Sequence, residues 1–325
     1  MSPHIGIVGL GLMGTAHAER LRDAGATIAG ADIDAKARDQ FTTQFEAPVF
    51  NDYNALIDSG VDAIVITVPN ALHEEVAVAA LESGVHVLVE KPLAHTVSSA
   101  ERIMAAARES TAFCIAGFVL RYYTCFEELH ARCVDGEFGE IQHVEAAYVR
   151  RDGVPERGWF RNPDLAGGGA VVDIGVHVLD LALAILDFPD IDGVYGRTRS
   201  ERARLDVEDS ATGLIRTSEG STIALETAWA ANRKARKEVV VRGSEGGATL
   251  DLSDETLTIY DATESEPDVC RPGETEWLTP EDEALVSAVK SRKPPMIGDL
   301  EEALAVQRVI ESLYESDATG EVVCP

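Results

Sequence analysis

Two groups of residues have the types and spacing needed to move a proton. Lys91 follows an apolar stretch and precedes a proline, so we expect its ammonium at the end of a strand. Asp173 and His177 come after the triple glycine 167–169 and are four positions apart. On a helix they would share one face. A neutral imidazole suits removal of a hydroxyl proton near neutral pH, and an ammonium can stabilise a developing alkoxide. A purely structural polar helix face is the alternative.

The start of the chain carries the glycine spacing of a dinucleotide-binding turn. The glycines follow the predicted strand 4–8 and open a helix, which is the context that this fingerprint requires. The first glycine permits a tight turn, the second admits the pyrophosphate, and the third lets the helix pack on the strand. The N-terminus of the helix then faces the phosphates. We therefore expect cofactor contacts from Gly9, Gly11, Leu12, Met13 and Gly14.

An acidic residue at the end of the second predicted strand indicates which dinucleotide is bound. Asp32 would accept hydrogen bonds from the adenosine ribose hydroxyls, which favours NAD, with NADP as the alternative. Asp34 is the nearest competitor for this role.

Two further strand ends should line the same cofactor cleft, because ligands of doubly wound sheets bind beyond the carboxyl ends of the strands. Asn70 could instead be the N-cap of a helix, and His73 a surface residue of its first turn. The residues expected to contact the cofactor here are Thr67, Pro69, Asn70, His73, Glu90 and Lys91.

Composition narrows the class of protein. Among 325 residues, 45% are hydrophobic, and 56 acidic residues face 28 basic ones, for a net charge of −28. This charge repels nucleic acids and anionic membranes, so we expect neither as a partner. There is no apolar run of about 18 residues that would span a membrane. The first predicted strand leaves no room for a signal peptide, so we expect a cytoplasmic protein.

The excess of acidic residues has two interpretations. The first is an ordinary acidic cytosolic enzyme. The second, which we favour, is adaptation to concentrated salt, as in a protein from a halophile. At about 1 M salt the Debye length is about 3 Å, so self-repulsion is screened. Only six of the 28 basic residues are lysines.

The sequence does not predict a metal site or a disulfide framework. The five cysteines are odd in number and form no C-x-x-C pair. No histidine–carboxylate cluster has the spacing of metal ligands along the chain. We therefore expect no bound metal.

The predicted elements indicate two α/β domains, residues 1–120 and 121–325. In the first, strands 4–8, 27–31, 63–68, 85–89 and 113–116 alternate with helices 14–24, 34–45, 72–83 and 98–109. This alternation predicts a doubly wound parallel sheet. In the second, a helix near 126–133 precedes strands 141–150, 192–199, 207–216, 221–230, 238–242, 249–252 and 256–260. These predict an open, mainly antiparallel sheet, covered by a helix starting near 173 and closed by helices 280–292 and 299–317.

With these motifs in place, the chain resembles the Gfo/Idh/MocA oxidoreductases over nearly its whole length. The family's Glu-Lys-Pro motif matches residues 90–92, whose Lys-Pro bond is typically cis. Its Gly-Gly-Gly, Asp and Gly-x-His-x-x-Asp pattern matches residues 167–180. The resemblance implies an NAD-binding Rossmann domain followed by a substrate-binding and oligomerisation domain. It also implies that Lys91, Asp173 and His177 form the catalytic group.

The expected function is hydride transfer between nicotinamide and a secondary hydroxyl of a sugar, cyclic polyol or sugar acid. The resemblance also suggests weaker substrate contacts from Arg121, Trp159 and Arg161, and a homodimer or homotetramer. Two alternatives stay open: a glycosidase that retains its NAD, and a sugar or NAD sensor without turnover.

Overall fold

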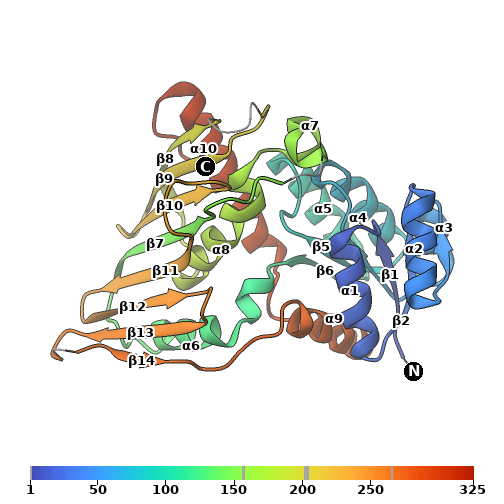
Figure 1. Ribbon diagram of the computed structural model, residues 1–325, viewed down its shortest axis with the longest axis horizontal. Helices are drawn as coiled ribbons and strands as arrows, with labels where there is room; N and C mark the ends of the chain where they lie inside the picture. Colours follow the sequence, from blue (N-terminus) through green and yellow to red (C-terminus); the bar gives the residue numbers. More distant parts are fainter. Residues whose placement is uncertain (1, 156–157, 201–204, 265) are drawn as a thin grey trace. The chain divides into compact units, whose positions relative to one another are not determined.

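The computed structural model describes residues 2–155, 158–200, 205–264 and 266–325. The chain divides into two compact units (Figure 1). The first comprises residues 1–119 and 276–304, and the second comprises residues 120–275 and 305–325. The sequence assigned residues 276–304 to the second domain, and this was wrong. Helix α9 (Thr279–Ser291) places Leu285, Val286 and Val289 in the hydrophobic cluster of the first unit.

The first unit contains a six-stranded sheet in the order β3-β2-β1-β4-β5-β6, with every pair parallel. This confirms the predicted doubly wound sheet. The strands are β1 (His4–Val8), β2 (Thr27–Ala31), β3 (Val49–Phe50), β4 (Ala63–Ile66), β5 (His86–Glu90) and β6 (Cys114–Gly117). The connecting helices are α1 (Leu12–Asp23), α2 (Ala35–Phe45), α3 (Tyr53–Asp58), α4 (His73–Glu82) and α5 (Val97–Glu109), with a short 3-10 turn at Asn70–Leu72.

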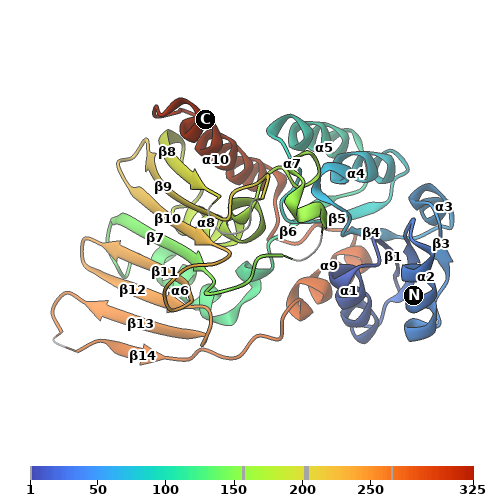
Figure 2. The same ribbon diagram turned by 45° about the horizontal axis from the view of Figure 1, so that its top comes forward.

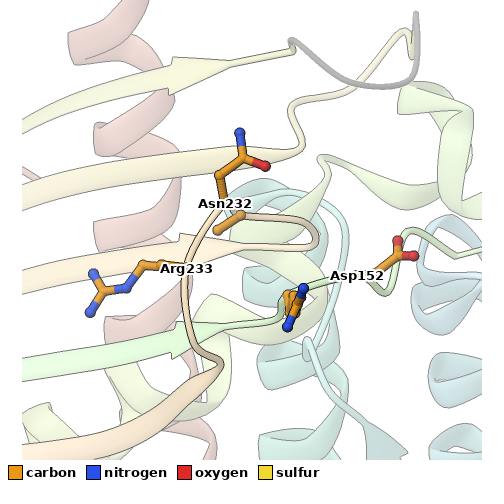
Figure 3. A pocket seen from close by; sticks show the side chains of 5 residues that line it. Asp152, Asn232 and Arg233 are labelled. Carbon is orange, nitrogen blue, oxygen red and sulfur yellow. The ribbon is translucent and has the colours of Figure 1, made fainter.

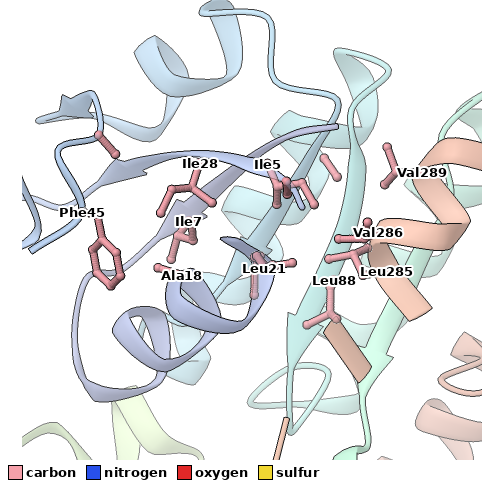
Figure 4. Close-up of a cluster of buried hydrophobic side chains, with 14 of the residues drawn as sticks. Ile5, Ile7, Ala18, Leu21, Ile28, Phe45, Leu88, Leu285, Val286 and Val289 are labelled. Carbon is pink, nitrogen blue, oxygen red and sulfur yellow. The ribbon is translucent and has the colours of Figure 1, made fainter. Parts of the chain in front are cut away.

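The core of this unit forms between the sheet and its helices (Figure 4). Ile5 and Ile7 of β1 pack with Leu21 of α1, and all three are fully buried. The strand order reverses between β1 and β4, so the connections that leave these two strands run in opposite directions along the sheet. Doubly wound sheets bind their ligands at this point.

The second unit contains an eight-stranded sheet in the order β14-β13-β12-β11-β7-β10-β9-β8. Only β7 and β10 pair in parallel among its described strands, which confirms the predicted, mainly antiparallel sheet. The strands are β7 (Ile141–Val149), β8 (Ile191–Arg199), β9 (Ser210–Thr217), β10 (Thr222–Ala228), β11 (Arg236–Gly243), β12 (Gly246–Asp251), β13 (Thr256–Asp261) and β14 (Asp268–Cys270).

Helices α6 (Thr124–Val134) and α8 (Val176–Ile185) lie on one face of this sheet (Figures 1 and 2). The short α7 (Pro163–Ala166) and a π-helical segment, Val171–Gly175, precede α8, and α10 (Leu300–Thr319) follows α9. By length and composition the stretch Pro163–Ile185 could cross a membrane. However, 83% of its most apolar window is buried inside the protein, as in the core helix of a globular domain.

Candidate functional site

The glycine-rich turn of the first unit has the geometry of a phosphate cradle. Gly9 has a φ of +95°, which L side chains rarely adopt. A Cβ on Gly14 would lie 1.9 Å from the Gly9 carbonyl oxygen, so only glycine fits there. Gly11 is the N-cap of α1 and offers no side-chain capping bond. The first backbone N–H groups of α1 are therefore uncapped by that residue, and the turn fits the pyrophosphate of a dinucleotide.

Asp32 lies against this turn. Its carboxylate accepts hydrogen bonds from the Leu10 N–H (2.7 Å) and the Asp34 N–H (2.8 Å). Asp34, the competing candidate, accepts from the Lys36 N–H at 2.9 Å and is the N-cap of α2. Of the two, Asp32 is the carboxylate bonded to the glycine-rich turn.

The turn after β4 is also tied to the glycine-rich turn. Thr67 Oγ1 donates to the Gly9 carbonyl at 2.6 Å. Pro69 is the N-cap of the 3-10 turn that begins at Asn70, which is buried. Asn70 is therefore not itself the cap.

His73 has a different place from the one predicted. Its ring is 1% exposed, and its two nitrogens lie 3.0 Å from the carbonyl oxygens of Val68 and Pro92. Burial lowers its pKa, against the opposing effect of these carbonyls. The imidazole therefore joins the segments that follow β4 and β5, and a cofactor contact by His73 stays a prediction.

Glu90 is the last residue of β5, and Lys91 follows it. The bond between Lys91 and Pro92 is cis, as the family resemblance implied. Glu90 is buried, with Oε1 3.1 Å from His17 Nε2 and with Oε2 accepting the Lys91 N–H at 3.0 Å. The Glu90 carboxylate is thus bonded inside the unit, and a cofactor contact by Glu90 stays a prediction.

The sequence did not reveal His17 as part of this group. Its Nδ1 lies 2.7 Å from Asp282 Oδ1, so both ring nitrogens face carboxylates. Only an imidazolium can donate from both. Burial alone would lower the pKa of His17, but Asp282 and Glu90 outweigh it and raise this pKa well above its usual value. His17 is therefore a cation held between two carboxylates.

Glu281 adds a third carboxylate to this group. It is 1% exposed, and neither of its oxygens has a hydrogen-bond partner among the described residues. One ligand atom each from His17, Glu90 and Glu281 lies within 4.8 Å of the others, a cluster that sequence spacing did not predict. Burial, and then the charge of Glu90, raises the pKa of Glu281 well above its usual value. A proton on Glu281 thus reduces the buried negative charge.

In the second unit, Asp173 and His177 lie on a helical segment that is otherwise inaccessible. Of residues 170–185, only these two are partly exposed, and all the others are buried. Asp173 precedes α8 in the π-helical segment, a local geometry that is frequent at functional sites. The predicted helix thus exists, but its first turns are wider than an α-helix.

Aromatic and cationic side chains surround these two residues. Asp173 Oδ2 accepts the Trp229 Nε1–H at 2.8 Å and lies 3.8 Å from Arg150 Nη1. The Tyr148 ring lies 6.5 Å from the His177 ring, between centroids. Trp229 and Tyr148 were not predicted, since aromatic residues on strands usually signal packing. Trp229 is fully buried, so the accessible face combines the His177 imidazole, the Asp173 carboxylate and the Tyr148 ring, which suits binding of a polyhydroxylated ring.

The three weaker substrate-binding candidates differ in their contacts and in their exposure to solvent. Arg121 is 7% exposed, ion-paired to Asp180, and its guanidinium lies 4.7 Å from the centre of the Phe188 ring. These contacts engage Arg121 inside its own unit, and the expected substrate contact stays a prediction. Trp159 is stacked on Phe160 at 3.8 Å. Arg161 is exposed and donates to the Pro155 carbonyl at 3.0 Å.

A pocket of about 530 Å³ lies at the carboxyl ends of β7 and β10 (Figure 3). It is lined by Arg151, Asp152, Ala231, Asn232 and Arg233. The two lining segments are joined by the Ala231 N–H, which donates to the Arg150 carbonyl at 3.0 Å. Arg151, the first residue of the pocket lining, thus directly follows Arg150 in the chain.

Comparison with known proteins assigns the family. Residues 4–118 match the model of an oxidoreductase family with an NAD-binding Rossmann fold, and residues 126–249 match the Gfo/Idh/MocA C-terminal domain. The D-glucoside 3-dehydrogenase of Escherichia coli is 32% identical over 282 residues, covering 80% of this chain and 78% of the relative. The chain belongs to the Gfo/Idh/MocA oxidoreductase family.

Two other known proteins are similar to most of this chain. The crystal structure of GenD2 from gentamicin A biosynthesis, in complex with NAD, is 30% identical. It has a TM-score of 0.86 and covers 99% of this chain and 96% of that chain. The D-xylose 1-dehydrogenase (NADP(+)) 2 of Haloferax volcanii is 28% identical and covers 84% of each chain. The predicted oxidoreductase class and Rossmann domain are confirmed.

Proposed function

We propose that this oxidoreductase is an NAD-dependent dehydrogenase that oxidises a secondary hydroxyl of a sugar, cyclic polyol or sugar acid. One observation carries the proposal: Asp173 and His177 are the accessible pair on an otherwise buried helical segment. The uncapped start of α1 and the Asp32 carboxylate at the same turn support NAD as the cofactor. The named activities of similar proteins, on glucosides and xylose, support the substrate class.

The proposed catalytic residues are Lys91, Asp173 and His177. The glycine-rich turn and Asp32 would hold NAD, which would supply the acceptor for the hydride that leaves the carbon of the hydroxyl. His177 takes the hydroxyl proton as a general base. Asp173, held by the Trp229 N–H, orients the ring or a neighbouring hydroxyl. Lys91 stabilises the negative charge that develops on the substrate oxygen.

A direct experiment follows NADH formation at 340 nm with a panel of pentoses, hexoses, inositols and sugar acids. The proposal expects NADH to accumulate with at least one of them. With a glycoside added to the panel, a glycosidase that retains its NAD would release sugar from it without net NADH, and a sensor would give neither product. Either result would overturn the proposal.

The net charge of −28 carries a second proposal, on stability. We propose that this is a salt-adapted, cytoplasmic enzyme that works as a homodimer or homotetramer. Circular dichroism and light scattering in about 2 M and 50 mM salt would test this, because the Debye length grows from a few ångströms to more than 10 Å. Loss of structure or of the oligomer at low salt is expected. Full stability at 50 mM would contradict salt adaptation and leave the enzymatic proposal intact.

A further inference from the structure

Lys237 is a partly buried lysine that no motif singled out. It lies on β11 directly opposite Tyr148 of β7, so both side chains project from the same face of the sheet. Its Nζ lies 5.2 Å from the centre of the Tyr148 ring and 5.6 Å from that of Tyr123. Among the described residues it forms no ion pair. A partly buried ammonium thus lies over two aromatic rings.

A second cation lies on the same tyrosine. The guanidinium of Arg150 is 5.2 Å from the centre of the Tyr148 ring, which itself neighbours His177. Arg150 Nη1 donates to the Gly153 carbonyl at 3.3 Å and is 3.8 Å from Asp173. The cations around Tyr148 therefore have only the Asp173 carboxylate at ion-pair distance among the described residues.

This arrangement has an electrostatic cost in the free protein. Burial lowers the pKa of Lys237, and Arg150 lowers it further, while Tyr148, Cys125 and Glu255 oppose this effect. Glu255 raises this pKa through its charge but forms no ion pair with Lys237, and its Oε2 accepts the Thr275 N–H at 2.9 Å. A partly buried ammonium without a paired carboxylate is unfavourable, and groups with a shifted pKa concentrate at functional sites.

We propose that Lys237 and Arg150 bind an anionic substituent of the substrate, a carboxylate or a phosphate carried by the sugar. This inference rests on the proposed function and narrows it to acidic sugars. Arg150 has the planar donor fork suited to such groups, and Lys237 supplies a point charge over Tyr148. The chain has a net charge of −28, yet two cationic side chains lie beside the proposed base, so the charge of this region differs in sign from that of the whole chain.

The test compares three sugars that share ring hydroxyls: D-glucose, D-glucuronate and D-glucose 6-phosphate, at one fixed ionic strength. In the wild type, kcat/KM should be highest for one of the two anions, and which one it is distinguishes carboxylate from phosphate. In Lys237→Met, KM for that anion should rise about 10- to 100-fold, the usual effect of losing a hydrogen bond to a charged group. KM for glucose should change less than about twofold.

Lys237→Arg should restore part of the affinity, because it keeps the charge. Lys234→Met is the matched control: it removes an exposed lysine three residues away and should leave all three KM values unchanged. Should Lys237→Met fail to fold by circular dichroism, Arg150→Met provides the same comparison. Equal losses for glucose and for the anions would overturn the inference, since they would assign Lys237 a structural role.

Binding without turnover separates this inference from the proposed function. Calorimetric titration with D-glucuronate and D-glucose 6-phosphate should show saturable binding that is lost in Lys237→Met, even if no sugar reduces NAD. Turnover of glucose with no preference for either anion would retain the dehydrogenase and refute the anion site. Binding of neither anion would refute the anion site whatever the activity.

Discussion

Each unit contains an aspartate and a histidine that could exchange a proton, and the two differ in their access to solvent. His17 in the first unit is fully buried, and its nitrogens face Asp282 and Glu90. In the second unit, Asp173 and His177 are the partly exposed residues of a buried segment. The same residue types therefore support two roles. A histidine held by two carboxylates stabilises the fold, whereas one that solvent and ligands can reach is available for chemistry.

The largest expected effect is on turnover at the accessible histidine. His177→Ala should lower kcat by roughly 10²–10⁴-fold, the usual effect of a positioned acid or base. Binding of NADH, followed by fluorescence titration, should remain nearly unchanged, because the glycine-rich turn lies in the other unit. Turnover near that of the wild type would show that His177 is structural and would remove the difference between the two histidines.

The same substitution at the buried histidine should act on stability. His17→Ala leaves Glu90 and Asp282 buried without their shared cation, and breaking such a group lowers the unfolding free energy by about 3–5 kcal/mol. Urea unfolding would measure the loss. His177→Ala, the matched control, should lower this free energy far less. Equal losses in the two variants would contradict the assigned roles.

The buried cation also predicts how stability depends on pH. Because the pKa of His17 is raised, the folded protein keeps a proton that the unfolded chain releases near pH 6.5. This contribution is fully present below that pH and is lost as the pH rises through the raised pKa. The unfolding free energy should therefore fall from about pH 6.5 upward. His17→Ala should flatten much of this slope.

Glu281 acts in the same direction, since burial raises its pKa and its ionisation in the folded state is unfavourable. Glu90 has a lowered pKa despite its burial, because of His17, and affects stability only in acid. A wild-type unfolding free energy that is constant between pH 7 and 9 would contradict an imidazolium at His17.

A smaller effect is expected at the cofactor turn. Asp32→Ser removes the carboxylate that would repel a 2′-phosphate, so the preference for NAD over NADP should narrow by about tenfold or more. The ratio of kcat/KM for the two cofactors measures this change. Asp32 also accepts a hydrogen bond from the Leu10 N–H, so its loss would loosen the turn and weaken the binding of both cofactors alike. The ratio of the two kcat/KM values removes this shared effect. A wild-type ratio that favours NADP would refute the preference itself.

Local patterns predicted much of the fold. Strands β1 and β2 begin and end where the apolar runs do, because every strand of a parallel sheet is buried on both faces. The two-residue β3 and the short α3 have too few residues to show a period, and neither was predicted. The place of α9 was missed because its amphipathic pattern does not say which core its apolar face joins.

The candidate site was predicted where spacing along the chain determines geometry, as for Asp173 and His177. It was missed where partners are distant: His17 and Asp282 are 265 positions apart. Lys237 lies in a short basic stretch that looks like surface. Only its pairing with Tyr148 across β11 and β7 brings it next to the aromatic ring that neighbours His177.

Rescue of His177→Ala by added imidazole tests the central claim most directly. With a substrate from the sugar panel and saturating NAD, the rate of NADH formation should rise with imidazole concentration, because the small base enters the accessible place of the lost ring. The His17→Ala rate should not rise, because solvent does not reach that position. A His177→Ala rate that stays flat, or equal rescue of both variants, would contradict the account.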